Sequence, residues 1–125
     1  MRNIKKRQGK CKQLLLHPIP VQRKRTAYLE TVKDQVDLVL FETMSDLYEV
    51  KAGVLAVKEH TDLPVFVTMT FEQNGRTLSG NDPETFINVA EGLGVDALGV
   101  NCSLGPDELK PIIDEILEKA SIPVM

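Results

Sequence analysis

The sequence lacks a long apolar run, and it has only two cysteines in 125 residues. No segment is apolar enough to span a bilayer, and the run from Leu14 to Leu16 is shorter than the roughly 7–15 residues that the core of a signal peptide needs. The two cysteines, Cys11 and Cys102, stand in unrelated contexts and indicate no disulfide framework. These absences disfavour a membrane protein and a secreted protein, and they predict a chain of the reducing cytoplasm.

Residues 1–25 contain no acidic and no aromatic residue, and they carry nine Lys or Arg. Residues 26–125 carry six basic residues against eighteen acidic ones. A basic arm of this kind can bind phosphates, but it has no ring to stack on a base. Because it shows no periodic apolar pattern either, we predict a disordered, solvated leader over residues 1–25, with nucleic-acid binding as the weaker alternative.

Short apolar segments alternate with amphipathic ones from residue 37 onward, which is typical of βα units and a parallel sheet. Three strands are predicted at residues 37–43, 64–71 and 96–102, and residues 122–125 resemble the opening of a fourth. Helices are predicted to start near Ser45 or Asp46, at Asp82, and near Asp107. A further helix is expected from residue 26 to about residue 36, and it runs into the first strand without the usual loop.

Polar side chains stand at the ends of the three predicted strands: Glu42 with Thr43, Thr70 before Phe71, and Asn101 with Cys102. In a parallel barrel all strand carboxyl ends open on one face, so we expect these side chains to converge there. A carboxylate at the end of a buried strand needs a cationic partner such as a ligand ammonium group, although a Glu42 that caps the next helix or pairs with a lysine fits equally well. Cys102 alone is a weak signal, because free cysteines usually pack in the interior, zinc needs about four ligands, and no second Cys or His lies at ligand spacing.

Four motifs occur together and in order: Phe-Glu-Thr-Met-Ser-Asp at 41–46, Thr-Phe at 70–71, Gly-Arg-Thr-Leu-Ser-Gly at 75–80, and Gly-Val-Asn-Cys-Ser-Leu-Gly-Pro at 99–106. With them, residues 37–125 closely resemble the homocysteine-binding, zinc-containing barrel of cobalamin-dependent methionine synthases. The resemblance implies an α/β fold, a fragment of about three βα units of a (β/α)8 TIM barrel, since a full barrel needs roughly 250 residues. The expected domains are the leader at 1–25 and a partial homocysteine S-methyltransferase barrel at 26–125, truncated at both ends.

By this resemblance Cys102 is one of three zinc thiolates, and the other two belong to a paired-cysteine motif beyond the end of the sequence. The resemblance also places Glu42 on the amino group of homocysteine and Asn101 in the substrate site, with Thr70 and the Arg76 loop as neighbours. Zinc would favour homocysteine as a thiolate, which takes a methyl group from methylcobalamin to give methionine. The cobalamin- and folate-binding modules of such an enzyme are absent from this chain.

Two alternatives stay open beside this interpretation. Homocysteine methyltransferases that use betaine or S-methylmethionine share the zinc and the glutamate, but not usually the loop motif at 76–80. A non-catalytic truncated or rearranged product is the other, because one zinc ligand of three is present and the family's opening Asp-Gly-rich strand motif is absent. We therefore expect the chain to be inactive by itself, and its open strand edges to favour association with a missing half.

Overall fold

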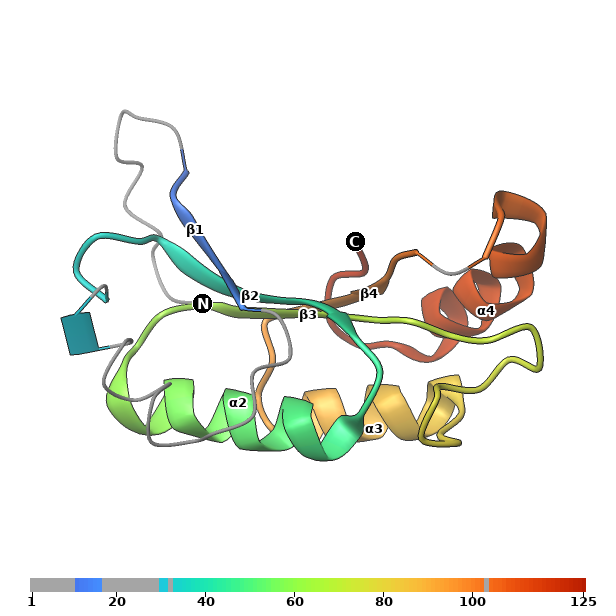
Figure 1. Ribbon diagram of the computed structural model, residues 1–125, viewed down its shortest axis with the longest axis horizontal. Coiled ribbons are helices and arrows are strands. Elements are labelled where there is room, and N and C mark those ends of the chain that lie inside the picture. The colour runs from blue at the N-terminus through green and yellow to red at the C-terminus, as the bar shows by residue number, and fades with distance from the viewer. Residues whose placement is uncertain (1–10, 17–29, 32, 103) are drawn as a thin grey trace.

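Within the described part of the chain, four parallel strands form one sheet in the order β1-β2-β3-β4 (Figure 1). The computed structural model describes residues 11–16, 30–31, 33–102 and 104–125. The strands are β1 (Gln13–Leu16), β2 (Leu38–Met44), β3 (Val65–Met69) and β4 (Ala97–Val100). Each strand pairs with the next one along the chain, and Val124 adds a single parallel bridge to Leu98 beyond β4. The predicted parallel sheet is thus confirmed, and the strand predicted at 122–125 is this one bridge.

A helix follows each of the last three strands: α2 (Leu47–His60), α3 (Pro83–Gly92) and α4 (Pro106–Lys119). Asp46 begins α2 by accepting a hydrogen bond from the Tyr48 backbone N–H. Asp82 begins α3 through the Thr85 N–H, with Pro83 in the first helical turn. Both starts are those that the capping residues predict, because a carboxylate satisfies free N–H groups of the first turn. No helix among the described residues is long and apolar enough to cross a bilayer.

The core lies between the sheet and helices α2 and α3, which run along the same face of the sheet (Figure 1). Apolar side chains from β2, β3 and β4 point to this face and are fully or almost fully buried, among them Val39, Phe41, Val65, Val67 and Leu98. They pack against the apolar stripes of the two helices, which include Val50, Val54, Val57, Phe86 and Ala90. Each Val, Leu or Phe side chain in this set stabilises the fold by about 1.5–3 kcal/mol when fully buried. This packing fixes where the carboxyl ends of the strands lie.

Strand β2 contains one extra residue near its carboxyl end. Phe41 pairs with Val67 and Met44 pairs with Met69, so three steps along β2 match two along β3. This β-bulge allows Phe41 and Met44 both to be buried, although the alternation of a regular strand would send them to opposite faces. Glu42 and Thr43 occupy the bulge and are only partly buried. The backbone therefore changes direction immediately before the loop to α2.

The N-terminal part differs from the sequence prediction in two places. Gln13–Leu16 form β1 and pair with β2, so the prediction of a disordered leader is wrong for these four residues. They are uncharged, and the parallel ladder together with the burial of Leu14 against the core offsets the cost of ordering them. Glu30 and Thr31 are helical, as predicted, but residues 33–35 form a turn, so the helix predicted up to residue 36 ends earlier and is not continuous with β2. Residues 1–10 and 17–29, which hold the rest of the predicted leader and the start of that helix, lie outside the described residues.

Candidate functional site

The predicted site residues all lie at the carboxyl edge of the sheet. Glu42 stands in the last part of β2, Thr70 directly follows β3, and Asn101 with Cys102 directly follow β4. Glu42, Thr70 and Asn101 are partly buried, and Cys102 is exposed. The parallel sheet therefore brings the strand ends to one edge, as expected from the chain pattern.

Asn101 connects the ends of β4 and β2. Its backbone N–H donates to the Met69 carbonyl at 3.2 Å, which extends the ladder with β3 by one step. Its side-chain Nδ2 donates to the Thr43 Oγ1 at 2.7 Å and to the Cys102 Sγ at 3.4 Å. The structure thus joins two of the predicted site residues, Asn101 and Cys102, and adds Thr43, to which the sequence analysis gave no role.

Two residues of this group adopt the left-handed backbone conformation that favours glycine. Thr43 has a φ of 60° and Cys102 a φ of 59°. For a β-branched residue such as Thr43 this conformation is a genuine outlier, and a residue in such a region costs about 1–3 kcal/mol. Strained residues of this kind cluster at binding and catalytic sites, so both positions mark this edge as a candidate site.

Thr70 forms two hydrogen bonds to the end of β2. Its backbone N–H donates to the Met44 carbonyl at 2.8 Å, and its Oγ1 donates to the same oxygen at 3.3 Å. The hydroxyl thus stabilises the chain directly after the bulge.

The carboxylate of Glu42 forms no hydrogen bond or ion pair with any residue that the structure describes. Helix α2 is capped by Asp46, so Glu42 is not its cap. The described residues therefore support neither of the two ordinary roles left open for this carboxylate, which were to cap the next helix and to pair with a lysine. A partly buried carboxylate without a cationic neighbour is a group that can bind a ligand cation.

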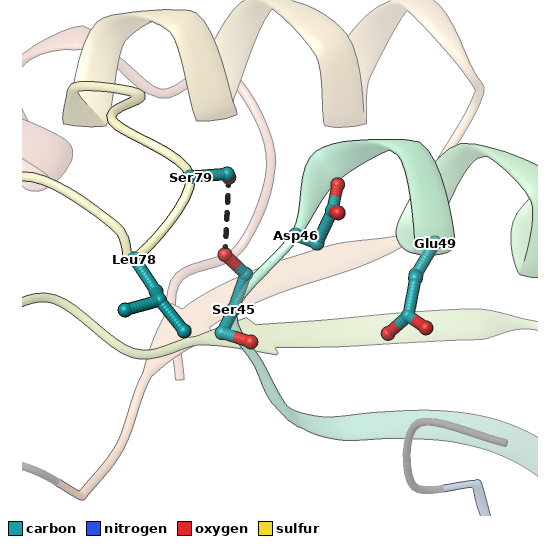
Figure 2. A pocket seen from close by; sticks show the side chains of 5 residues that line it. All are labelled: Ser45, Asp46, Glu49, Leu78 and Ser79. Atoms are coloured by element: carbon teal, nitrogen blue, oxygen red, sulfur yellow. Dashed lines mark hydrogen bonds between the residues drawn. The ribbon is translucent and has the colours of Figure 1, made fainter. Parts of the chain in front are cut away.

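A cavity of about 340 Å³ opens next to this edge, between the β2–α2 loop and the loop after β3 (Figure 2). Ser79 Oγ donates to the Ser45 carbonyl at 3.1 Å and closes one side of it. The cavity is lined by Ser45, Asp46, Glu49, Leu78 and Ser79, which do not include any of the four predicted site residues. The loop motif alone does not predict this lining, because the lining depends on how two loops meet.

The loop from 75 to 80 is held in shape by its own contacts. Arg76 Nη1 donates to the Gly80 carbonyl at 2.9 Å and lies 3.5 Å from an Asp82 carboxylate oxygen. Hydrogen bonds from Thr85, first from its hydroxyl and then from its backbone N–H, hold the pKa of Asp82 below its ordinary value, and Arg76 adds to this effect. The loop is therefore fixed against the start of α3, and two of its residues, Leu78 and Ser79, line the cavity.

A complete zinc site is not formed by the residues described. No group of three or more His, Cys, Asp or Glu side chains among them could hold a metal ion. Cys102 offers a single thiolate, whereas a zinc site requires about four ligands. The donor set of this edge therefore does not fit zinc by itself.

Comparison with known proteins agrees with the residue pattern. Residues 17–125 match the model of the homocysteine S-methyltransferase family. The methionine synthase of Mycobacterium leprae (strain TN) is 36% identical over 109 residues, and that of Mycobacterium tuberculosis (strain ATCC 25618 / H37Rv) is 34% identical over 109 residues. Each match covers 80% of this chain but 9% of the relative, so the chain spans a small part of these proteins. The family match begins at residue 17, inside the segment predicted as leader.

Comparison with solved structures confirms that this chain has the α/β fold of part of a barrel. The apo form of the homocysteine methyltransferase MmuM from Escherichia coli superposes with a TM-score of 0.75 at 16% identity, over 90% of this chain and 47% of MmuM. The carboxyl transferase domain of Rhizobium etli pyruvate carboxylase gives a TM-score of 0.60 at 15% identity, over 90% of this chain and 22% of that chain. Such low identities bear on the fold alone, and the family follows from the sequence match over residues 17–125. This chain belongs to the homocysteine S-methyltransferase family.

Proposed function

We propose that this chain supplies the homocysteine-binding edge of a methyltransferase barrel of the methionine synthase type. The single observation that carries the proposal is the juxtaposition of Asn101, Cys102 and Thr43 at the carboxyl edge on which Glu42 also lies. Family membership supports the substrate class, and the 36% identity to a methionine synthase supports this branch of the family.

Glu42 is the proposed partner of the homocysteine amino group. Its carboxylate is partly buried and has no ion-pair partner among the described residues, so a ligand ammonium group would supply the missing positive charge. Asn101 and Thr70 are the proposed neighbours of the bound amino acid, since both stand at adjacent strand ends. These residues would bind and orient the substrate.

Cys102 is the proposed single contribution of this chain to a zinc centre. The described residues form no group of three or more possible metal ligands, so zinc would bind here only together with cysteines supplied by another segment. The proposed methyl donor is methylcobalamin, bound by a module other than this chain, and a folate-binding module would be a further partner. The proposed location is the cytoplasm, where the free thiols of Cys11 and Cys102 stay reduced.

The amino-group contact can be tested on the full chain with two thiols. Homocysteine and 4-mercaptobutanoic acid differ by the amino group, and we expect the chain to prefer homocysteine in an NMR titration under reducing conditions. Glu42→Gln keeps the shape of the side chain and removes its charge, so it should weaken homocysteine binding by about tenfold or more and abolish the preference. Glu59→Gln, on the exposed end of α2, is the matched control and should change neither value.

Activity is tested by adding a separately made C-terminal half of a related barrel that carries the paired cysteines. We expect the mixture to bind zinc and to form methionine from homocysteine, with methylcobalamin preferred over betaine and S-methylmethionine as donor. Equal binding of the two thiols by the wild-type chain, together with no zinc uptake in the mixture, would contradict the proposal and favour a non-catalytic product.

A further inference from the structure

The Thr43 side chain stands between the bulge of β2 and the carboxamide of Asn101. Its Oγ1 lies 2.7 Å from Asn101 Nδ2, a link between residues 58 positions apart in the chain. Because Asn101 Nδ2 also lies 3.4 Å from the Cys102 Sγ, the orientation of one amide group is coupled to both strand ends. Thr43 is therefore placed to fix the orientation of the Asn101 carboxamide.

Thr68 holds Thr43 in this unusual position. The backbone N–H of Thr43 donates to the Thr68 Oγ1 at 3.0 Å, and Thr68 is buried, with 4% of its surface exposed. In the bulge, Glu42 and Thr43 together stand opposite Thr68. A bulged residue is displaced from the regular ladder, so a side-chain acceptor on the neighbouring strand is a direct way to satisfy its N–H.

One polar atom of the Asn101 carboxamide is left over. Oδ1 is buried and has no hydrogen-bond partner within the described part of the chain. If the oxygen and nitrogen of this amide were exchanged, the Thr43 hydroxyl would donate to the oxygen, and the nitrogen would become the buried atom without a partner. In either orientation Thr43 holds one end of the amide, and the other end lacks a partner among the described residues. A buried polar atom in that state calls for a ligand or a water.

We propose that Thr43 is a positioning residue, which fixes the Asn101 carboxamide so that its unpaired atom is presented to the bound substrate. Thr68 supports it by fixing the bulge. The inference rests on the proposed function only in naming homocysteine as that substrate, since the hydrogen bonds are present in the chain without a ligand.

The test compares variants of Thr43 in the full chain. Thr43→Val keeps the branched shape and the backbone strain but removes the hydroxyl, whereas Thr43→Ser keeps the hydroxyl. Thr43→Ala is a second variant without the hydroxyl that fits a positive φ more easily if the valine variant does not fold. Thr61→Val, which removes a hydroxyl bonded to the Val57 carbonyl at the far end of α2, is the control.

Two readouts separate the inference from the proposed function. The first is the ¹H–¹⁵N signal of the Asn101 side-chain amide, identified by its loss in Asn101→Asp and recorded without ligand. We expect it to shift and to exchange faster in Thr43→Val, and to keep its position in Thr43→Ser and Thr61→Val. The second is homocysteine binding, which should weaken by about tenfold in Thr43→Val and recover in Thr43→Ser.

Each outcome decides one of the two claims. An Asn101 amide signal that is unchanged in Thr43→Val overturns the inference, whether or not homocysteine binds. A shifted signal with unchanged homocysteine affinity also overturns it, because the orientation of the amide would then not matter to the substrate. If the wild-type chain binds no homocysteine, the proposed function fails, and the amide signal still decides whether Thr43 holds Asn101.

Discussion

Replacing Gly99 by alanine should destabilise this chain, whereas the same replacement at Gly92 should stabilise it. Gly99 lies in β4, and an added Cβ would overlap the backbone oxygen of Met125 and lie 2.9 Å from its Cγ. The overlapping atom belongs to the backbone, so the segment that ends at Met125 would have to move away from β4. Gly92 lies at the end of α3, and no atom lies within 4 Å of a Cβ built there.

The magnitude follows from the contacts that hold this segment. The Met125 N–H donates to the Leu98 carbonyl at 2.9 Å, and the Leu98 N–H donates to the Pro123 carbonyl at 3.0 Å. Losing both costs about 2 kcal/mol at roughly 1 kcal/mol each, and alanine in a strand recovers about 0.5–1 kcal/mol relative to glycine. Gly99→Ala should therefore lower the free energy of unfolding by about 1–1.5 kcal/mol, and Gly92→Ala should raise it by about 0.4–1 kcal/mol.

Urea unfolding of both variants, followed by circular dichroism, measures the two free energies. Amide hydrogen exchange then locates the change, because Gly99→Ala should remove the protection of the Leu98 and Met125 amides and leave that of Val67 intact. A Gly99→Ala variant as stable as the wild type, or one that keeps protection at Leu98, would refute the steric argument. Gly92→Ala controls for the general effect of alanine on the unfolded chain.

Two further substitutions test the contributions of Asp82 and Phe71 to the stability of the fold. Asp82→Asn should make the fold lose less stability in acid than the wild type does. Hydrogen bonds from Thr85 hold the pKa of Asp82 below its ordinary value of 3.8, so the carboxylate stabilises the fold above pH 3.8. This contribution is lost as the pH falls through the lowered pKa, and the variant lacks it from the start. Urea midpoints measured from about pH 7 to about pH 2 should fall less steeply in the variant than in the wild type, and parallel curves would contradict this assignment. Phe71→Ala should cost about 3–5 kcal/mol in urea unfolding, because Phe71 is fully buried with its ring centroid 6.3 Å from that of Phe86; a loss below about 1 kcal/mol would show that the ring adds little to the core.

Helix starts and central strands were predictable because their causes are local. Asp46 and Asp82 are capping residues that act on N–H groups two or three positions away, so their effect is visible in a short window of sequence. The strands β2, β3 and β4 consist mostly of apolar residues, which is typical of parallel strands. Strand β1 was missed because three leucines are too short a run to show a period, and its pairing with β2 is a long-range contact.

The position of the candidate residues was predictable from the sequence, but the hydrogen bonds between them were not. Polar residues at strand ends indicate that Glu42, Thr70, Asn101 and Cys102 lie at one edge of the sheet, and family resemblance suggests their roles. The role of Thr43 could not be read from the sequence, because it depends on a bulge that shifts the register between β2 and β3. Register is decided by which side chains can be buried across two strands, and no local pattern reports it.

The order of the strands also has a consequence for how the site forms during folding. Each strand pairs with the one made just before it, at separations of 25 residues for Gln13 with Leu38, 26 for Val39 with Val65 and 31 for Phe66 with Ala97. Such neighbouring units close short loops and can dock in sequence as the chain grows. The contact between Thr43 and Asn101 spans 58 residues and crosses β3, so it can form only after β4 has docked. A chain that stalls before β4 would therefore hold much of the apolar core but would lack the hydrogen bond between Thr43 and Asn101.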